Sequence, residues 1–194
     1  MNKELSEMTN EELWALFPII LAPYDPAWGE RYAQERERIE RAVGKENIAR
    51  ISHIGSTAVP GLIAKPTIDI LLEITKGCEP ERLKAALVAA EYIFTPQPEN
   101  PPPHMMFMKG YTPHGFEGQA YHLHVRYSGD WDELYFRDYL IANPEVAQIY
   151  GALKKRLRRR YEHARDAYTQ AKTGFVRQHT ALARSEFANK HRIK

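Results

Sequence analysis

Apolar residues recur at helical spacing after the dipeptide Asp25-Pro26. Asp25 is a suitable N-cap, and Pro26 fits the first turn because its missing N–H would have no helical partner there. The apolar positions that follow, as far as Gly44, are Trp28, Tyr32, Ile39 and Val43. The pattern predicts an amphipathic helix of about four turns, with Trp28 and Tyr32 packed into the core.

Shorter apolar runs, bounded by Gly and Pro, indicate strands in the next part of the chain. We predict strands over residues 48–54, 67–74, 92–95, 105–109 and 119–127, a helix over 81–91 and an extended Pro-rich loop over 96–103. The last two strands flank a turn rich in Gly and Pro and are expected to form a hairpin. A short helix before the first long one is expected from Thr9 or Asn10 to Phe17.

From Asp132 onward the pattern is helical, with Asn143-Pro144 marking a second helix start. Together, these predicted helices and strands indicate an α/β fold with a mixed sheet and two or three C-terminal helices. We expect an N-terminal extension over residues 1–18, an α/β core over 19–130 and a basic helical segment over 131–194, with this segment packed on the core as one domain.

The composition narrows the class of protein. The chain has 194 residues, 43% of them hydrophobic, and a single cysteine, so an intrachain disulfide and a Cys-rich zinc site are excluded. The sequence has no apolar run near the roughly 18 residues of a membrane-spanning helix, and its N-terminus lacks the basic-then-apolar order of a signal peptide. We therefore expect a cytoplasmic protein without a membrane partner.

Charge is distributed unevenly along the chain. Residues 151–194 carry 13 basic and 3 acidic side chains, against 14 and 22 in residues 1–150. The densest basic run, from Lys154 to Arg160, is typical of a solvated helix face, and its alternative role is contact with phosphates of RNA or of a nucleotide. Binding of nucleic acid would need exposed aromatics among the cations, and only Tyr161 lies close by, so nucleic acid is not an expected partner.

The clearest candidate chemistry lies at Gly55-Ser56-Thr57, which follows one predicted strand, and at Asp69 on the next. A small Gly-Ser turn lets backbone N–H groups and a hydroxyl approach phosphate oxygens closely. A carboxylate on the neighbouring strand can hold a divalent metal against those phosphates. The simpler alternative is an ordinary turn followed by a strand-end aspartate.

A second candidate is the strand over residues 119–127, whose alternation places His122, His124 and Arg126 on one face. A His-x-His pair can ligate zinc, manganese or another transition metal, and Asp69 would complete a mixed nitrogen and oxygen site if the two strands are neighbours. Alternatively, one imidazole acts as a general base or contacts a phosphate, or both histidines only bond to neighbouring groups. His53, just before the Gly-Ser turn, can join either arrangement.

Several blocks of the sequence resemble the GrpB family, over roughly residues 19–180. They are Pro23-Tyr24-Asp25-Pro26 with Trp28, the run from His53 to Ile70, His122-Leu123-His124-Val125, Phe136-Arg137-Asp138-Tyr139-Leu140, and Tyr168 with Ala171-Lys172. The resemblance implies a nucleotidyltransferase-like mixed sheet flanked by helices. It also implies a Gly-Ser turn that holds outer phosphates and carboxylates that bind Mg²⁺ or Mn²⁺, while an acceptor hydroxyl attacks the α-phosphorus. Some GrpB domains are fused to dephospho-CoA kinase, which points to nucleotide or coenzyme chemistry.

The sequence departs from that superfamily pattern at the second carboxylate, where it has Leu71. Glu73 shares the strand face of Asp69 but lies about 6.6 Å beyond position 71, which is far for a shared metal ligand. The third carboxylate is also missing from the candidate strand, where histidines stand instead.

Two lysines complete the candidate nucleotide site. Lys65 and Lys172, together with His53, Gly55, Ser56 and Thr57, are expected to contact a nucleotide or another phosphate-containing small molecule. Asp69, His122 and His124 are expected to be catalytic and to hold Mg²⁺ or Mn²⁺, or else Zn²⁺. Arg137 and Asp138 are expected to form a structural ion pair.

Two functions remain open at this point. One is transfer of a nucleoside monophosphate from a nucleoside triphosphate to a small-molecule or protein hydroxyl. The other is a catalytically diminished module of the same fold that binds a nucleotide, coenzyme or metal. Neither the acceptor nor the oligomeric state follows from the sequence.

Overall fold

The computed structural model describes residues 3–192, so the outermost two residues of the predicted 1–18 and 131–194 segments lie outside the described part. Its helices are α1 (Asn10–Leu16), α2 (Ala27–Val43), α3 (Pro80–Ala89), α4 (Asp132–Ala142), α5 (Pro144–Tyr161), α6 (Arg165–Gln170) and α7 (Thr173–Glu186). Its strands are β1 (Ile48–Ile54), β2 (Thr67–Ile74), β3 (Ile93–Thr95), β4 (Met105–Thr112) and β5 (Gly115–Tyr127).

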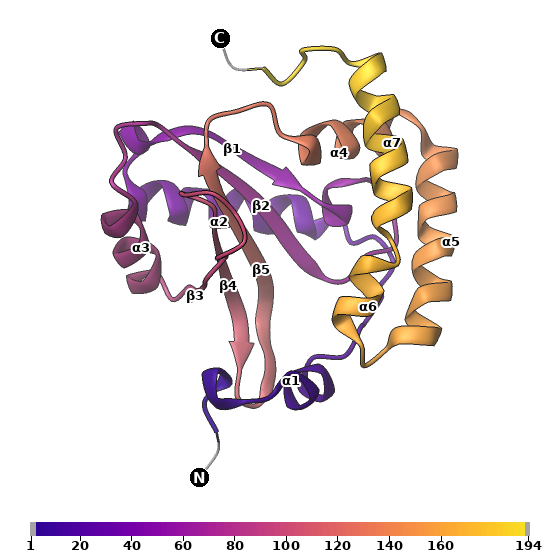
Figure 1. The fold of residues 1–194 in the computed structure, drawn as a ribbon, viewed down its shortest axis with the longest axis horizontal. Coiled ribbons are helices and arrows are strands. Elements are labelled where there is room, and N and C mark those ends of the chain that lie inside the picture. The colour runs from indigo at the N-terminus through magenta and orange to yellow at the C-terminus, as the bar shows by residue number, and fades with distance from the viewer. Residues whose placement is uncertain (1–2, 193–194) are drawn as a thin grey trace.

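The five strands form one mixed sheet in the order β1-β2-β5-β4-β3. β2 and β5 pair in parallel at its centre, and the other pairs are antiparallel. The connection between the two central strands contains α3, β3 and β4 (Figure 1). The mixed sheet flanked by helices that the sequence predicted is therefore confirmed.

One face of the sheet carries the main core. Alternate residues of β2 and β5 pack there with helix α2, whose Trp28 and Ile39 are each 1% exposed. The strand residues of this cluster include Ile68, Ile70, Leu72, Ile74, Leu123 and Val125. Trp28 is a core residue as predicted, and Tyr32 is partly buried against the same cluster, stacked on His53 at 4.8 Å between ring centres.

The opposite face of β2 and β5 carries the remaining alternate residues, and these are mostly polar. They are Asp69, Leu71 and Glu73 on β2, and His122, His124 and Arg126 on β5. Helices α4–α7 lie together on this side of the molecule (Figure 1). Because these helices pack mainly on one another and on the turn after β1, polar side chains remain between them and the sheet.

The helical C-terminal part divides into four helices, where we expected two or three. The chain leaves helical hydrogen bonding around His163-Ala164 and again at Lys172, and α7 begins directly after Lys172. The predicted hairpin is also longer than expected. Gly110, with φ +83°, lies at a register shift between Lys109 and Tyr111, and this irregularity lets the ladder continue to Thr112 and Gly115.

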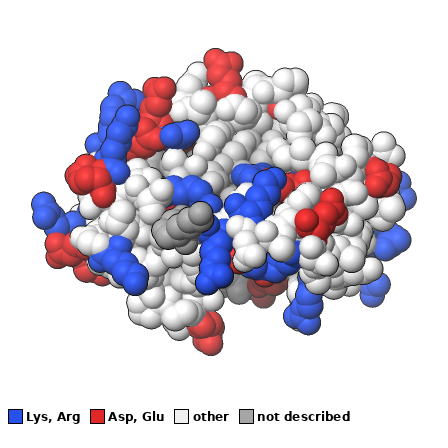
Figure 2. Space-filling view, turned by 90° about the horizontal axis from the view of Figure 1, so that it is seen from above, with Lys and Arg blue, Asp and Glu red and all other residues white. Residues whose placement is uncertain are grey.

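Charge does not separate into two single-sign halves on the face shown in Figure 2, where basic and acidic side chains alternate around the rim. Several ion pairs join the acidic and basic parts of the chain, for example Arg184 with Asp130 and Asp132. Arg137 and Asp138 form the expected ion pair, with 2.6 Å between Nη2 and Oδ1. Within residues 3–192, no helix is both long enough and apolar enough to cross a membrane.

Candidate functional site

The turn after β1 places its backbone directly against Asp69. Ile54, the last residue of β1, pairs with Asp69 of β2, and Gly55 follows with φ +71° and ψ −171°. A Cβ at position 55 would lie 2.4 Å from Oδ2 of Asp69. Only glycine meets both demands, since this backbone conformation is almost exclusive to glycine and the carboxylate occupies the space of a side chain.

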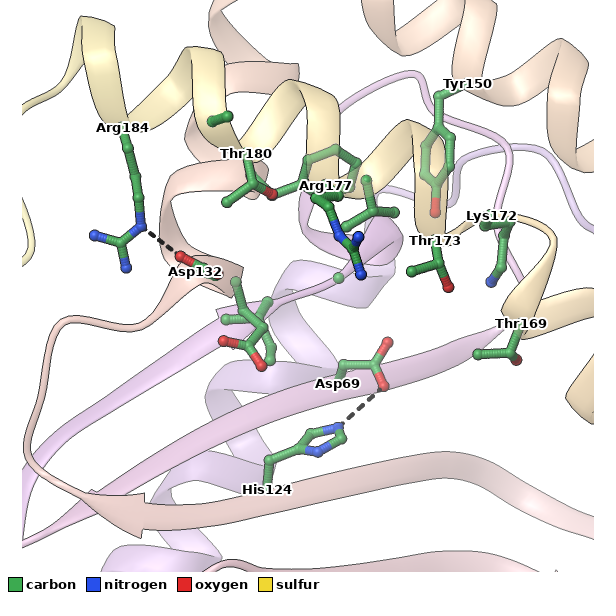
Figure 3. Close-up of a pocket in the computed structure, with 16 residues that line it drawn as sticks. Asp69, His124, Asp132, Tyr150, Thr169, Lys172, Thr173, Arg177, Thr180 and Arg184 are labelled. Carbon is green, nitrogen blue, oxygen red and sulfur yellow. Dashed lines mark hydrogen bonds and ion pairs between the residues drawn. The ribbon is translucent and has the colours of Figure 1, made fainter. Parts of the chain in front are cut away.

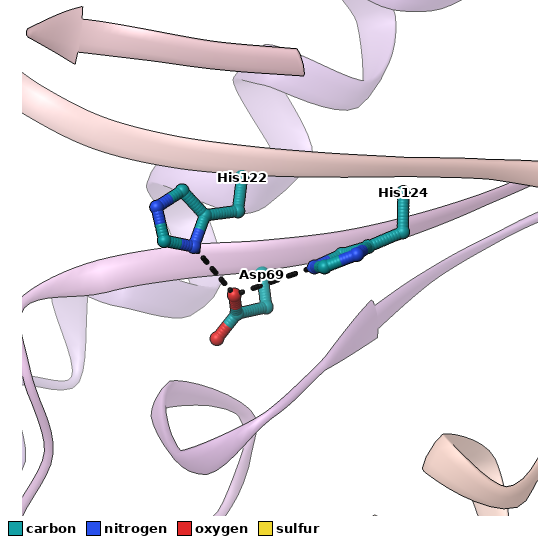
Figure 4. Close-up of side chains that lie close together, drawn as sticks. All are labelled: Asp69, His122 and His124. Carbon is teal, nitrogen blue, oxygen red and sulfur yellow. Dashed lines mark hydrogen bonds and ion pairs between the residues drawn. The ribbon is translucent and has the colours of Figure 1, made fainter. Parts of the chain in front are cut away.

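Asp69, His122 and His124 come together because β2 and β5 are adjacent and parallel. Asp69 is in register with His122, and Leu71 is in register with His124, so all four side chains share one face of the sheet. Oδ1 of Asp69 lies 3.2 Å from Nδ1 of His122 and 3.7 Å from Nε2 of His124 (Figure 4). One ligand atom from each residue lies within 4.8 Å of the other two, which is compact enough to surround one metal ion.

The electrostatics of this cluster favour a charged Asp69 and a neutral His122. Burial opposes ionisation of Asp69, but the hydrogen bonds of His122 and His124 outweigh it and lower the Asp69 pKa. Burial lowers the pKa of His122, whose side chain is 8% exposed. Tyr111 contacts the other ring nitrogen of His122, with 2.7 Å between the hydroxyl oxygen and Nε2, and so orients the ring.

Three lysines lie around the cluster in an adjoining cavity of about 890 Å³. Burial lowers the pKa of Lys65 to about 7, that of Lys154 to about 7 and that of Lys172 to about 8. Neighbouring cations lower these pKa values further, and for Lys65 they include Arg165 and Lys172. Asp69 is the nearby carboxylate that opposes the shift for Lys65 and Lys172, so the cavity contains more potential positive charge than negative charge.

Lys154 connects helix α5 to the turn after β1. Its Nζ donates to Oγ of Ser56 at 3.0 Å and to the carbonyl oxygen of Ile63, and its side chain lies over the Tyr150 ring. Tyr168 is also part of the cavity wall. Its side chain is fully buried, and its hydroxyl has no hydrogen-bond partner within the described residues. Burial raises the Tyr168 pKa to about 12, so this hydroxyl is an unused donor.

The cavity extends from the cluster toward helices α4 and α7. Figure 3 shows Asp69, Lys172 and Arg177 pointing into this part, with Tyr150 above them and Thr173 beside Lys172. Phe136 and Val176 add apolar surface, and the volume of this part is about 650 Å³. A ligand can therefore place charged groups beside the lysines and a less polar part against α7.

Two of the expected site residues, His53 and Thr57, do not line either part of the cavity. His53 Nε2 lies 2.9 Å from Oγ1 of Thr57, which donates to the Thr67 carbonyl. Burial lowers the pKa of His53 to about 4. These contacts connect β1, the turn and the start of β2, so both residues support the turn. Gly55, Ser56, Lys65 and Lys172 do line the cavity.

The structure places an apolar cluster where a second carboxylate would stand. Leu71 is fully buried with Ile54 and Leu134. Glu73 is also fully buried, and its carboxylate is paired with the Arg50 guanidinium. Because Glu73 is held in this ion pair, it does not join the cluster of Asp69, His122 and His124.

Sequence reasoning missed Lys154, Arg165 and Tyr168 as cavity residues. Lys154 was expected on a solvated face, and this prediction is wrong, since the residue is 2% exposed. A signal was present, because position 154 falls at helical spacing on the stripe formed by Ala147, Tyr150, Gly151 and Leu157. Arg165 lies in a short connecting helix, where no such periodic pattern identifies it.

The chain resembles several known proteins. The sequence profile of the GrpB protein family matches residues 18–182. A UPF0157 protein of Pseudomonas aeruginosa is 41% identical over 174 residues, which cover 89% of this chain and 70% of that protein. A dephospho-CoA kinase of Mycolicibacterium paratuberculosis is 28% identical over 183 residues, which cover 82% of this chain but 44% of the kinase.

A solved structure shares the fold described above. The crystal structure of the conserved protein GrpB from Enterococcus faecalis superimposes with a TM-score of 0.73 at 29% sequence identity, covering 87% of this chain and 99% of the other. The profile match spans the whole sheet, helices α4–α6 and the larger part of α7. This chain belongs to the GrpB family.

Proposed function

We propose that this protein binds a phosphate-bearing small molecule, of the nucleotide or coenzyme class, beside one divalent metal ion. The observation that carries the proposal is the convergence of Lys65, Lys154 and Lys172 on one cavity. Arg165 adds a fourth cation to its lining, against the two carboxylates Asp69 and Asp166. Buried lysines with lowered pKa values regain their protons when an anion enters, because the anion supplies the missing counter-charge. The cavity is therefore suited to a ligand with several negative charges.

The metal ion would be held by Asp69, His122 and His124. One carboxylate and two imidazoles suit Zn²⁺, Mn²⁺ or a similar transition metal better than Mg²⁺, which prefers oxygen ligands. Three protein ligands leave coordination positions open for the ligand. When bound, the metal would polarise a phosphoryl oxygen as a Lewis acid.

The side chains of this chain have separate tasks in binding. Ser56 and the backbone of its turn approach the phosphate oxygens closely, since Gly55 leaves no Cβ in the way. The lysines neutralise the negative charge of the ligand. The less polar part beside Phe136 and Val176 accepts the organic moiety.

Nucleotidyl transfer is the second candidate, favoured by the contact of the Gly55-Ser56 turn with Asp69. In that reaction an acceptor oxygen forms a bond to the α-phosphorus, the bond to the departing pyrophosphate breaks, and the acceptor proton goes to a base or to water. Leu71 and Glu73 leave Asp69 as the one carboxylate among the clustered ligands, so the geometry favours the diminished binding module over the transferase.

A thermal-shift titration with tripolyphosphate and ATP, each with Zn²⁺, Mn²⁺ or no metal, tests the binding function. Wild type should be stabilised most by metal and polyphosphate together. Asp69→Asn should lose the metal-dependent part, and Lys154→Met should lose the metal-independent part. Lys155→Met is the matched control, because this neighbouring lysine is exposed. Equal shifts in Lys154→Met and Lys155→Met would contradict the proposed role of the cavity.

Pyrophosphate release separates the two candidates. A transferase should release pyrophosphate from ATP when a mixture of hydroxyl acceptors is supplied, and Asp69→Asn should stop the release. A binding module should be stabilised by ATP without releasing pyrophosphate.

A further inference from the structure

A second cavity of about 300 Å³ lies beside the first and shares Lys65, Thr67 and Arg165 with its lining. Its outer wall is the segment from Phe17 to Ile20, which leads from α1 toward α2, and its inner wall comes from the β4–β5 hairpin and Pro66. The lining is mainly apolar and includes Phe17, Ile19, Tyr111 and Phe116. We call this space the N-terminal chamber.

Aromatic rings give the chamber a fixed shape. Phe17 lies edge-on to Tyr111 and to Phe116, with 5.0 Å between ring centres in each pair. Ile20 and Phe116 are 44% and 42% exposed and lie at the solvent side of the lining. A flat or compact apolar group of modest size can therefore enter from solvent and pack against rings that already hold one another in place.

Two cations that face this apolar space form no ion pair with a carboxylate among residues 3–192. Lys65 and Arg165 line both the chamber and the metal-site cavity, so they form the wall between them. Within residues 3–192, neither side chain has a carboxylate at ion-pairing distance, whereas Arg31, the other cation of the chamber, is paired with Asp25 at 3.2 Å. Arg165 instead contacts neutral groups, the Tyr111 hydroxyl at 3.4 Å and Nε2 of His122 at 3.3 Å.

We propose that the N-terminal chamber binds a small molecule with a compact apolar body and one anionic group, a carboxylate or a phosphate monoester. The apolar body packs against Phe17, Ile20 and Phe116, and the anionic group lies at Lys65 and Arg165. Cations that border a low-dielectric pocket without a partner attract an anion more strongly than solvated ones do. Binding in the chamber involves no metal ion and does not depend on the proposed function.

Three probes test the chemistry of this site: benzoate, phenyl phosphate and benzyl alcohol, which share a benzene ring and differ in charge. We expect saturable binding of both anions by ligand-observed NMR, and binding of benzyl alcohol that is weaker by about tenfold or more. Equal affinity for the alcohol and the anions would overturn the role of Lys65 and Arg165. All titrations contain EDTA, so failure of the metal proposal leaves this result unaffected.

Variants at the solvent side locate the binding. Ile20→Glu places a carboxylate beside the chamber cations and should weaken both anionic probes by about tenfold or more. Phe116→Glu places a carboxylate at a second position of the lining and should also weaken both anionic probes. Thermal unfolding shows whether each variant is folded. Ile149→Glu is the matched control, since Ile149 is 60% exposed on α5 and lines neither cavity. Wild-type affinity in folded Ile20→Glu and Phe116→Glu would place the probes elsewhere and overturn the proposal.

Discussion

The ammonium group of Lys154 on α5 lies 3.0 Å from the hydroxyl oxygen of Ser56 in the turn after β1. Its other hydrogen-bond partner is the carbonyl oxygen of Ile63, so without a bound anion both partners are neutral. The contact joins residues 98 positions apart in the sequence and fixes the turn relative to the helices that cover it. It also keeps a cation beside the candidate phosphate site.

Lys154 should make folding stability increase with pH. Burial lowers its pKa to about 7 in the folded chain, whereas an unfolded lysine has a pKa of about 10.4. Between these pH values the unfolded chain binds more protons, so the free energy of unfolding rises from pH 7 to pH 9. Denaturant titrations of ligand-free protein should show this slope reduced in Lys154→Met and retained in Lys155→Met. An unchanged slope in Lys154→Met would contradict the buried placement.

Polyphosphate binding should follow the opposite pH dependence. An anion binds the protonated lysines, and the pKa values of Lys65 and Lys154 are about 7 and that of Lys172 about 8. The affinity for tripolyphosphate, measured by calorimetry without metal, should therefore fall as the pH rises from 6 to 9. Affinity that stays constant over this range would show that the buried lysines do not hold the phosphates.

Gly55→Ala should be more damaging than another glycine replacement at positive φ. The alanine Cβ would lie 2.4 Å from Oδ2 of Asp69, and this backbone conformation alone costs of order 1–3 kcal/mol for a residue other than glycine. Gly61→Ala is the control, because Gly61 has φ +76° and a Cβ added there would have no neighbouring atom within 4 Å. Gly55→Ala should weaken metal binding as well as stability, whereas Gly61→Ala should affect stability alone. Calorimetric metal titration and thermal unfolding measure the two effects.

Leu71→Asp should destabilise the protein instead of creating a second metal ligand. Leu71 is fully buried against Ile54 and Leu134, and an unpaired carboxylate in such a place costs about 3 kcal/mol or more. Leu71→Met keeps the volume and should cost less than about 1.5 kcal/mol. Chemical denaturation measures both values. A stable Leu71→Asp protein that binds a second metal ion would show that the position remains part of a metal site.

The sheet could be predicted closely because β1 and β2 are short apolar runs with clear Gly and Pro boundaries. The register between β2 and β5 could not be predicted, because pairing of strands separated by a long connection depends on tertiary packing. The sequence therefore identified Asp69 and the two histidines as candidate site residues but could not give the distances between them. The parallel pairing of Asp69 with His122 is what turns them into one cluster.

The lysine cluster shows where the reasoning from sequence was insufficient. Lys65 and Lys172 were found through the family resemblance, but Lys154 lies within a basic run whose other members are mostly exposed. The composition of the run indicates that it is polar as a whole. The burial of a single residue depends instead on which positions of α5 face the turn. The sequence could not show that the Tyr168 hydroxyl lacks a hydrogen-bond partner among the described residues, because hydrogen-bond partners depend on the fold.

Calorimetric titration of metal-free protein with Zn²⁺, at a pH where histidine is neutral, tests the central claim most directly. We predict one Zn²⁺ ion per chain, and a loss of affinity of at least about 100-fold in Asp69→Asn and in His124→Gln. His163→Gln serves as the control, because His163 is exposed and lies outside the cluster. Zinc binding that is absent in wild type, or equally strong in Asp69→Asn, His124→Gln and His163→Gln, would contradict a metal centre at Asp69, His122 and His124.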